Sequence, residues 1–189
     1  MKDILITEID IAETLTYLGF KGNIPDSRIL SAIKRCEEVL LDTITPRFVY
    51  KVTDTSNPLI VGRDLSGLLK DCEKAVFFCC TLGQMTDRLI NSAGVTDIEE
   101  QLYLDALANA AIEQVCDKAQ EIITNVYPEY KKTTRFSPGY GDYPLNLQPQ
   151  ILDFLDAKKL IGVTVNESLL MIPAKSVSAV FGLEKRSFS

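Results

Sequence analysis

The stretch Lys74-Ala75-Val76-Phe77-Phe78-Cys79-Cys80-Thr81-Leu82 is nearly continuous in apolar residues. A strand with one face in water alternates apolar and polar side chains, whereas a strand covered on both faces does not. We therefore expect residues 74–82 to form a strand that is buried on both faces of a sheet.

The longest helical pattern begins at about residue 97 and continues to about residue 125 without glycine or proline. Thr96, with Glu99 three residues later, matches a capping box and predicts Thr96 as the N-cap. One face of this helix is dense in alanine, which permits close approach of a neighbouring strand or helix. Glu113 flanks that face, and its carboxylate either points into an adjoining cleft or lies in solvent.

Shorter helices and strands surround these two elements. Apolar spacing and the Gly and Pro breaks predict helices at about 10–19, 26–41, 64–69, 84–94 and 148–157. The same criteria predict strands at about 48–52, 59–61, 159–165, 169–172 and 177–183. We expect the first two of these strands to pair as a hairpin.

The order of these elements predicts the fold class. Because hairpins and helices occur without regular β-α-β alternation, we predict an α+β fold with a mixed, mainly antiparallel sheet and flanking helices. The length of 189 residues favours a single domain. We expect an N-terminal helical segment at 1–45, followed by the α+β core at 46–189.

Composition excludes several classes of function. The chain contains no histidine, so Ser-His-Asp and Cys-His catalysis are excluded, as are histidine-based zinc and haem sites. The net charge of −6 disfavours non-specific binding to nucleic acid, which depends on a basic surface. The five cysteines form no C-x-x-C pair, and we predict no metal site.

Other patterns narrow the remaining classes. The turn Thr81-Leu82-Gly83-Gln84 has a single glycine, so the chain carries no dinucleotide-binding fingerprint there, and no P-loop pattern occurs. No apolar run approaches the roughly 20 residues that a membrane helix needs, and the first residues lack the features of a signal peptide. We expect a cytoplasmic protein.

The loop after the long helical pattern is a candidate binding site. In Arg135-Phe136-Ser137-Pro138-Gly139-Tyr140, Pro138 and Gly139 suit the two central positions of a type II turn. Such a turn brings Arg135 and Tyr140 to the mouth of one loop. The segment is either a small-anion site or an ordinary connection with a surface arginine and a packing tyrosine.

Two motifs carry a resemblance to a known family. Arg135, Gly139 and Tyr140 fit an R-x-x-x-G-Y pattern. The segment Glu167–Ser178 fits a second pattern, E-S-x-x-M-x-P-x-x-S-V-S. With both motifs, the chain resembles the S-adenosylmethionine-binding activation domain of cobalamin-dependent methionine synthase, in a stand-alone version.

The resemblance implies roles for individual residues. Arg135 is expected to clamp the ligand carboxylate with its planar fork, and Glu113 to pair with the ammonium or lie near the sulfonium. The tyrosine of the motif offers a ring beside the sulfonium, and its glycine lets the backbone approach the ligand. The expected S-adenosylmethionine-binding residues are Glu113, Arg135, Ser137, Pro138, Gly139 and Tyr140.

The implied function is the reductive methylation of cobalamin that has oxidised to its inactive form. S-adenosylmethionine supplies the methyl group, and a flavodoxin-like donor supplies the electron. We expect the cobalamin to lie on a partner, a methionine synthase or related corrinoid protein, because no residue of this chain could be its axial imidazole ligand.

Two alternatives remain at the level of the sequence. The chain departs from the family pattern at Asp142 or Tyr143 and at Ile172, where a cysteine and a tryptophan are common. These departures favour a non-catalytic docking or chaperone module for a corrinoid protein. A third interpretation is an α+β protein whose pocket takes another small ligand with a carboxylate.

Overall fold

The computed structural model describes residues 2–20 and 22–186. Within this part of the chain the main sheet has five strands in the order β1-β2-β3-β7-β4, and all of its pairings are antiparallel. The strands are β1 (Lys2–Asp3), β2 (Arg47–Asp54), β3 (Lys74–Thr81), β7 (Ser176–Lys185) and β4 (Tyr130–Lys132). A second, two-stranded sheet joins β5 (Thr164–Val165) to β6 (Met171–Ile172).

β3 lies in the middle of the main sheet and is buried on both faces. Val76 and Phe78 belong to one apolar core, and Phe77 and Cys79 belong to a second core on the opposite face. This division follows from the two-residue period of a strand, which sends successive side chains to opposite faces. The prediction of a doubly buried strand is confirmed, and so is the α+β class.

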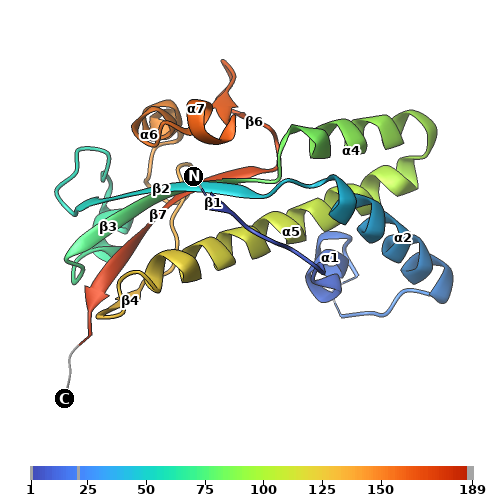
Figure 1. Cartoon of the computed structure of the whole chain (residues 1–189), viewed down its shortest axis with the longest axis horizontal. Coiled ribbons are helices and arrows are strands. Elements are labelled where there is room, and N and C mark those ends of the chain that lie inside the picture. Colours follow the sequence, from blue (N-terminus) through green and yellow to red (C-terminus); the bar gives the residue numbers. More distant parts are fainter. Residues whose placement is uncertain (1, 21, 187–189) are drawn as a thin grey trace.

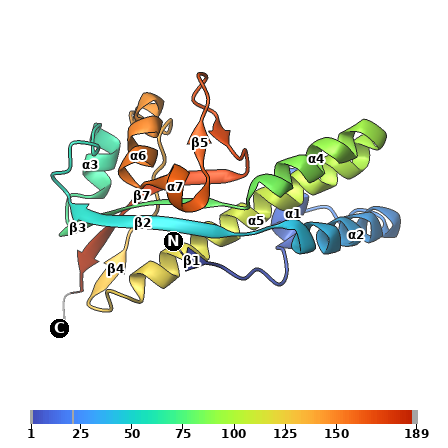
Figure 2. The same cartoon turned by 45° about the horizontal axis from the view of Figure 1, so that its top comes forward.

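Helices cover the two faces of the sheet (Figures 1 and 2). The first core is formed with α1 (Ile11–Tyr17), α2 (Ser27–Thr43), α4 (Gln84–Thr96) and α5 (Ile98–Thr124). The second core is formed with α3 (Arg63–Leu68), α6 (Gln148–Phe154) and α7 (Ala157–Ile161). A short 3₁₀ turn, η1 (Leu145–Leu147), precedes α6. No helix in the described ranges has both the length and the apolar character of a membrane span.

α5 runs along the sheet and confirms the long helix expected from the sequence (Figure 1). Its alanine-rich face, which includes Ala108, Ala111 and Ala119, is fully buried against the first core. The predicted cap at Thr96 is wrong. Asp97 is the N-cap, and its carboxylate accepts hydrogen bonds from the backbone N–H groups of Glu99 and Glu100. Thr96 cannot take this position, because it is still the last residue of α4.

Two further predictions of local structure are wrong. Residues 59–61 do not pair with β2. β3 pairs with β2 along its whole length, and the apolar side chains of residues 59–61 pack against the second core instead. Residues 159–161 belong to α7 rather than to a strand, and only Thr164–Val165 is extended. Asp156, with positive φ, separates this short helix from α6, and Gly162, also with positive φ, ends it.

The N-terminal helices pack on the same side as α5. α1 and α2 both contact α5, and apolar side chains of all three helices join the first core. The helical segment predicted before residue 46 is thus present as α1 and α2. The organisation as a single domain over 1–189 stays a prediction.

Enlarging the small side chains of α5 should destabilise the protein. Ala111 has no exposed surface, so Ala111→Leu forces extra methyl groups between α5 and the sheet. We expect a loss of about 1–3 kcal/mol in the free energy of unfolding, measured by urea denaturation. Ala12→Leu, at an exposed helical position, is the matched control. Equal stability of the two variants would contradict close packing at Ala111.

Candidate functional site

Arg135 reaches the middle of α5 because the chain after β4 continues alongside β7. Phe136 exchanges two backbone hydrogen bonds with Val180, at 2.8 and 2.9 Å, and its ring packs against the second core. Since successive side chains of extended backbone point to opposite faces, Arg135 points toward the face that α5 covers.

The guanidinium of Arg135 is held by three side chains of α5. It forms ion pairs with Glu113 and Asp117, and it donates a hydrogen bond of 2.9 Å to Oε1 of Gln120. These three residues lie on one helical face, since their spacing is four and then three residues. The arginine side chain is 23% exposed. Burial alone would lower the pKa of Arg135, but the hydrogen bonds to Asp117 and Glu113 outweigh it and raise this pKa, so the side chain stays cationic.

The loop has the turn geometry that its sequence predicts. The backbone N–H of Tyr140 donates to the carbonyl of Ser137 at 3.2 Å, and Gly139 has φ of 93°. That φ lies in the region where a side chain is strained, so glycine is required at this position. The turn leaves Tyr140 largely in solvent, with 68% of its surface exposed.

Two side chains beyond the turn fasten this loop to the second-core side of the molecule. The carboxylate of Asp142 accepts hydrogen bonds from the backbone N–H groups of Arg63 and Asp64, at 2.7 and 3.1 Å. Tyr143 is buried, and its hydroxyl donates to the carbonyl of Leu59 at 3.0 Å. No local pattern in the sequence predicts these contacts, because their partners lie about 80 residues away.

A cavity of about 370 Å³ lies between the loop, α5 and the start of β7. Its lining includes five of the six predicted site residues: Glu113, Arg135, Ser137, Pro138 and Tyr140. Gly139 does not line the cavity and instead forms the turn. The remaining lining residues are Phe136, Leu145, Gln148, Met171, Ser176, Val177 and Ser178.

Part of the second sequence motif, Glu167–Ser178, lines the cavity, and part of it lies on the surface. Met171 and the segment Ser176–Ser178 line the cavity. Hydrogen bonds fix two of its hydroxyls, from Ser176 to Thr81 at 2.8 Å and from Ser178 to Gln148 at 3.3 Å. Glu167 and Ser168 lie instead at the exposed connection between β5 and β6.

Two residues of α1, Glu13 and Tyr17, lie near this site and were not predicted from the sequence. Burial raises the pKa of Glu13, and the charges of Glu113, Asp10 and Asp117 raise it further, whereas Arg135 lowers it. Burial, followed by the charges of Glu113 and Glu13, also raises the pKa of Tyr17. Both side chains therefore lie near Glu113 and Arg135 but do not line the cavity. Their spacing of four residues places them on one face of α1, but the sequence predicted a site role for neither.

Comparisons of the sequence and the fold with known proteins point to one family. Residues 77–188 match the sequence model of a protein family that is described as "Vitamin B12 dependent methionine synthase, activation domain". Among solved structures, the chain is similar to one titled "Crystal Structure of the MetH Reactivation Domain bound to AdoHcy". The TM-score is 0.70 at 19% sequence identity, over 96% of this chain and 75% of the other, and it shows a shared fold. The search of curated proteins found no match.

The contact of Asp142 with α3 should make the stability of the protein depend on pH. Hydrogen bonds from the backbone of Arg63 and Asp64 lower the pKa of Asp142 below its ordinary 3.8. A lowered folded-state pKa stabilises the protein above the ordinary pKa, and this contribution disappears as the pH falls through the folded-state value. Asp142→Asn should therefore lower the Tm at neutral pH, with a difference that narrows in acid. Asp71→Asn, at an exposed position, is the control, and a difference that is constant with pH would contradict the assignment.

Glu13 should show the opposite behaviour. Its folded-state pKa is raised, so its ionised form costs stability at neutral pH, and protonation removes that cost as the pH falls through the raised value. Glu13→Gln should raise the Tm of the ligand-free protein at neutral pH, and the gain should shrink in acid. Thermal melts across this range, with Glu38→Gln as the exposed control, test the sign. A Tm lowered by Glu13→Gln would contradict a destabilising repulsion between Glu13 and the carboxylates of Glu113, Asp10 and Asp117.

Proposed function

The chain belongs to the vitamin B12 dependent methionine synthase activation domain family, and on this premise we propose that it binds S-adenosylmethionine for the reductive methylation that reactivates the cobalamin of methionine synthase. One observation carries the proposal. Arg135 and Glu113, from a loop and a helix, meet at one cavity that both sequence motifs also line.

The lining of the cavity fits the parts of this ligand. A volume of about 370 Å³ is in the range of small-molecule sites. The guanidinium of Arg135 suits a carboxylate, and Glu113 suits an ammonium. Leu145, Met171 and Val177 offer apolar surface for the adenosine part. These groups support binding of the whole ligand rather than of a bare anion.

The charge around Arg135 favours a cationic ligand. Glu113 and Asp117 both pair with the guanidinium, and their charges also raise the pKa of nearby Glu13. These four side chains together carry an excess of two negative charges when all are ionised. S-adenosylmethionine carries an ammonium and a sulfonium against one carboxylate. Its carboxylate would pair with Arg135 and its ammonium with Glu113, in place of the ion pair between these two side chains. Each buried charge would then still have a partner of opposite sign.

In this proposal the chain binds and orients the methyl donor. The arginine fork fixes the carboxylate end, and the ring of Tyr140 lies beside the sulfonium at the solvent side of the cavity. Gly139 supplies the positive φ of the turn that presents Tyr140 to the cavity. The ligand supplies an activated methyl group, so these residues need to supply position and charge rather than a general base.

The cobalamin is proposed to lie on a partner. The chain has no histidine to serve as an axial imidazole, and the cavity opens at Tyr140 and Leu145, whose side chains are exposed. A methionine synthase or related corrinoid protein would present cobalamin at this opening, and a flavodoxin-like protein would supply the electron. The cavity supports this arrangement better than a docking module without a ligand, because the charged groups of Glu113 and Arg135 both line it.

Calorimetric titration with S-adenosylmethionine tests the proposal, and Arg135→Ala should weaken binding by about 1.5–3 kcal/mol, the value of a hydrogen bond to a charged group. Arg88→Ala, an exposed arginine outside the cavity, is the matched control and should bind like the wild type. Failure of the wild-type protein to bind, alone or with its cobalamin-carrying partner, would refute the proposal.

A further inference from the structure

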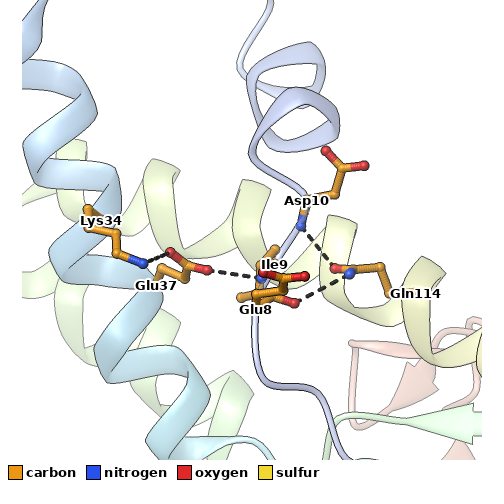
Figure 3. Close-up of polar contacts among 6 residues, drawn as sticks. All are labelled: Glu8, Ile9, Asp10, Lys34, Glu37 and Gln114. Carbon is orange, nitrogen blue, oxygen red and sulfur yellow. Dashed lines mark hydrogen bonds and ion pairs between the residues drawn. The ribbon is translucent and has the colours of Figure 1, made fainter.

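The segment from Leu5 to Asp10 is held in place by side chains rather than by secondary structure. The backbone N–H of Ile9 donates to Oε1 of Glu37 on α2 at 2.9 Å, and the N–H of Asp10 donates to Oε1 of Gln114 on α5 at 3.1 Å. The amide nitrogen of Gln114 also donates to the carbonyl of Glu8 at 3.3 Å (Figure 3). We call residues 5–10 the strap, because they run from the sheet edge to α1 across these two helices.

Glu37 is a buried carboxylate whose two oxygens are both used. One accepts the N–H of Ile9 and the other forms an ion pair of 2.8 Å with Lys34, while the side chain is only 3% exposed. A buried carboxylate is costly unless it is paired and hydrogen-bonded. Ile9 itself is buried in the first core. The burial of Glu37 is therefore coupled to the position of the strap.

Gln114 links the strap to the binding site. It is the neighbour of Glu113 on α5, and its side-chain amide contacts the backbone on both sides of Ile9 (Figure 3). Asp10 is in turn the N-cap of α1, where its carboxylate accepts the N–H of Glu13 at 2.9 Å. A continuous path of hydrogen bonds thus runs from Gln114 through Asp10 to Glu13.

We propose that Glu37 and Gln114 are positioning residues of the ligand site, which fix the strap so that α1 holds Glu13 and Tyr17 beside Glu113. The inference rests on the proposed function, since the ligand concerned is S-adenosylmethionine. α1 has only seven residues and packs on α5 through a few partly buried apolar side chains. A helix of this length is marginal by itself, so its placement depends on how its first residue is fixed.

The test combines ligand binding with local hydrogen exchange. Gln114→Leu keeps the approximate size of the side chain and loses both contacts to the strap. We expect faster exchange at the amides of α1, unchanged exchange in β3, and affinity for S-adenosylmethionine weakened roughly two- to tenfold, the range of one hydrogen bond. Gln150→Leu, at an exposed position of α6, is the matched control and should change neither readout.

A double-mutant cycle separates positioning from a general loss of structure. In a Glu13→Gln background, Gln114→Leu should weaken binding much less than in the wild type, because its effect passes through Glu13. Glu37→Gln retains an oxygen for the N–H of Ile9 and should bind nearly as well as the wild type, whereas Glu37→Leu should not. If Gln114→Leu does not fold, Gln114→Asn, which is too short to reach the strap, replaces it with the same expected results.

The outcomes distinguish this inference from the function on which it rests. A wild-type protein that does not bind S-adenosylmethionine overturns both. A wild-type protein that binds, together with a Gln114→Leu protein of equal affinity, overturns the inference alone. If Gln114→Leu weakens binding equally in the wild-type and Glu13→Gln backgrounds, the inference is overturned as well. The effect of Gln114 on affinity would then not pass through Glu13 on α1.

Discussion

The ion pairs of Arg135 with Glu113 and Asp117 are the interaction on which the site depends. They join the loop after β4 to the middle of α5, across the edge of the first core. A guanidinium that is mostly withdrawn from water is costly unless its donors are satisfied, and here three side chains of one helix satisfy them. The sheet and α5 are both rigid, well-packed elements, so the position of this charge is set by the fold and not by the loop alone.

The same cluster carries a cost that a ligand would relieve. Carboxylates outnumber the guanidinium, and burial together with their mutual repulsion raises the pKa of Glu13. Folding tolerates this crowding because packing around β3 and α5 supplies the stability of the core. A ligand with two positive groups would offset the surplus charge. The strap, anchored by Glu37 and Gln114, then determines how closely Glu13 approaches.

The sequence predicted those parts of the structure that depend on local pattern. The apolar run of β3, the length of α5 and the turn at Gly139 each follow from side chains that are adjacent in the chain, and the structure confirms them. The hairpin at 59–61 was predicted wrongly because β2 pairs with β3, which is a more distant strand in the sequence. The contacts of Arg135 with Asp117 and Gln120 could have been anticipated from their helical spacing relative to Glu113. The approach of Glu13 could not, because it depends on the tertiary contact between α1 and α5.

The most direct test of the account is a crystal structure of the protein grown with S-adenosylhomocysteine. The account predicts the ligand in the cavity between α5 and the Arg135–Tyr140 loop, with its carboxylate bound by the guanidinium of Arg135 and its ammonium facing Glu113. A ligand bound at another surface, with Arg135 still paired to Glu113 and Asp117 and remote from it, would contradict the account.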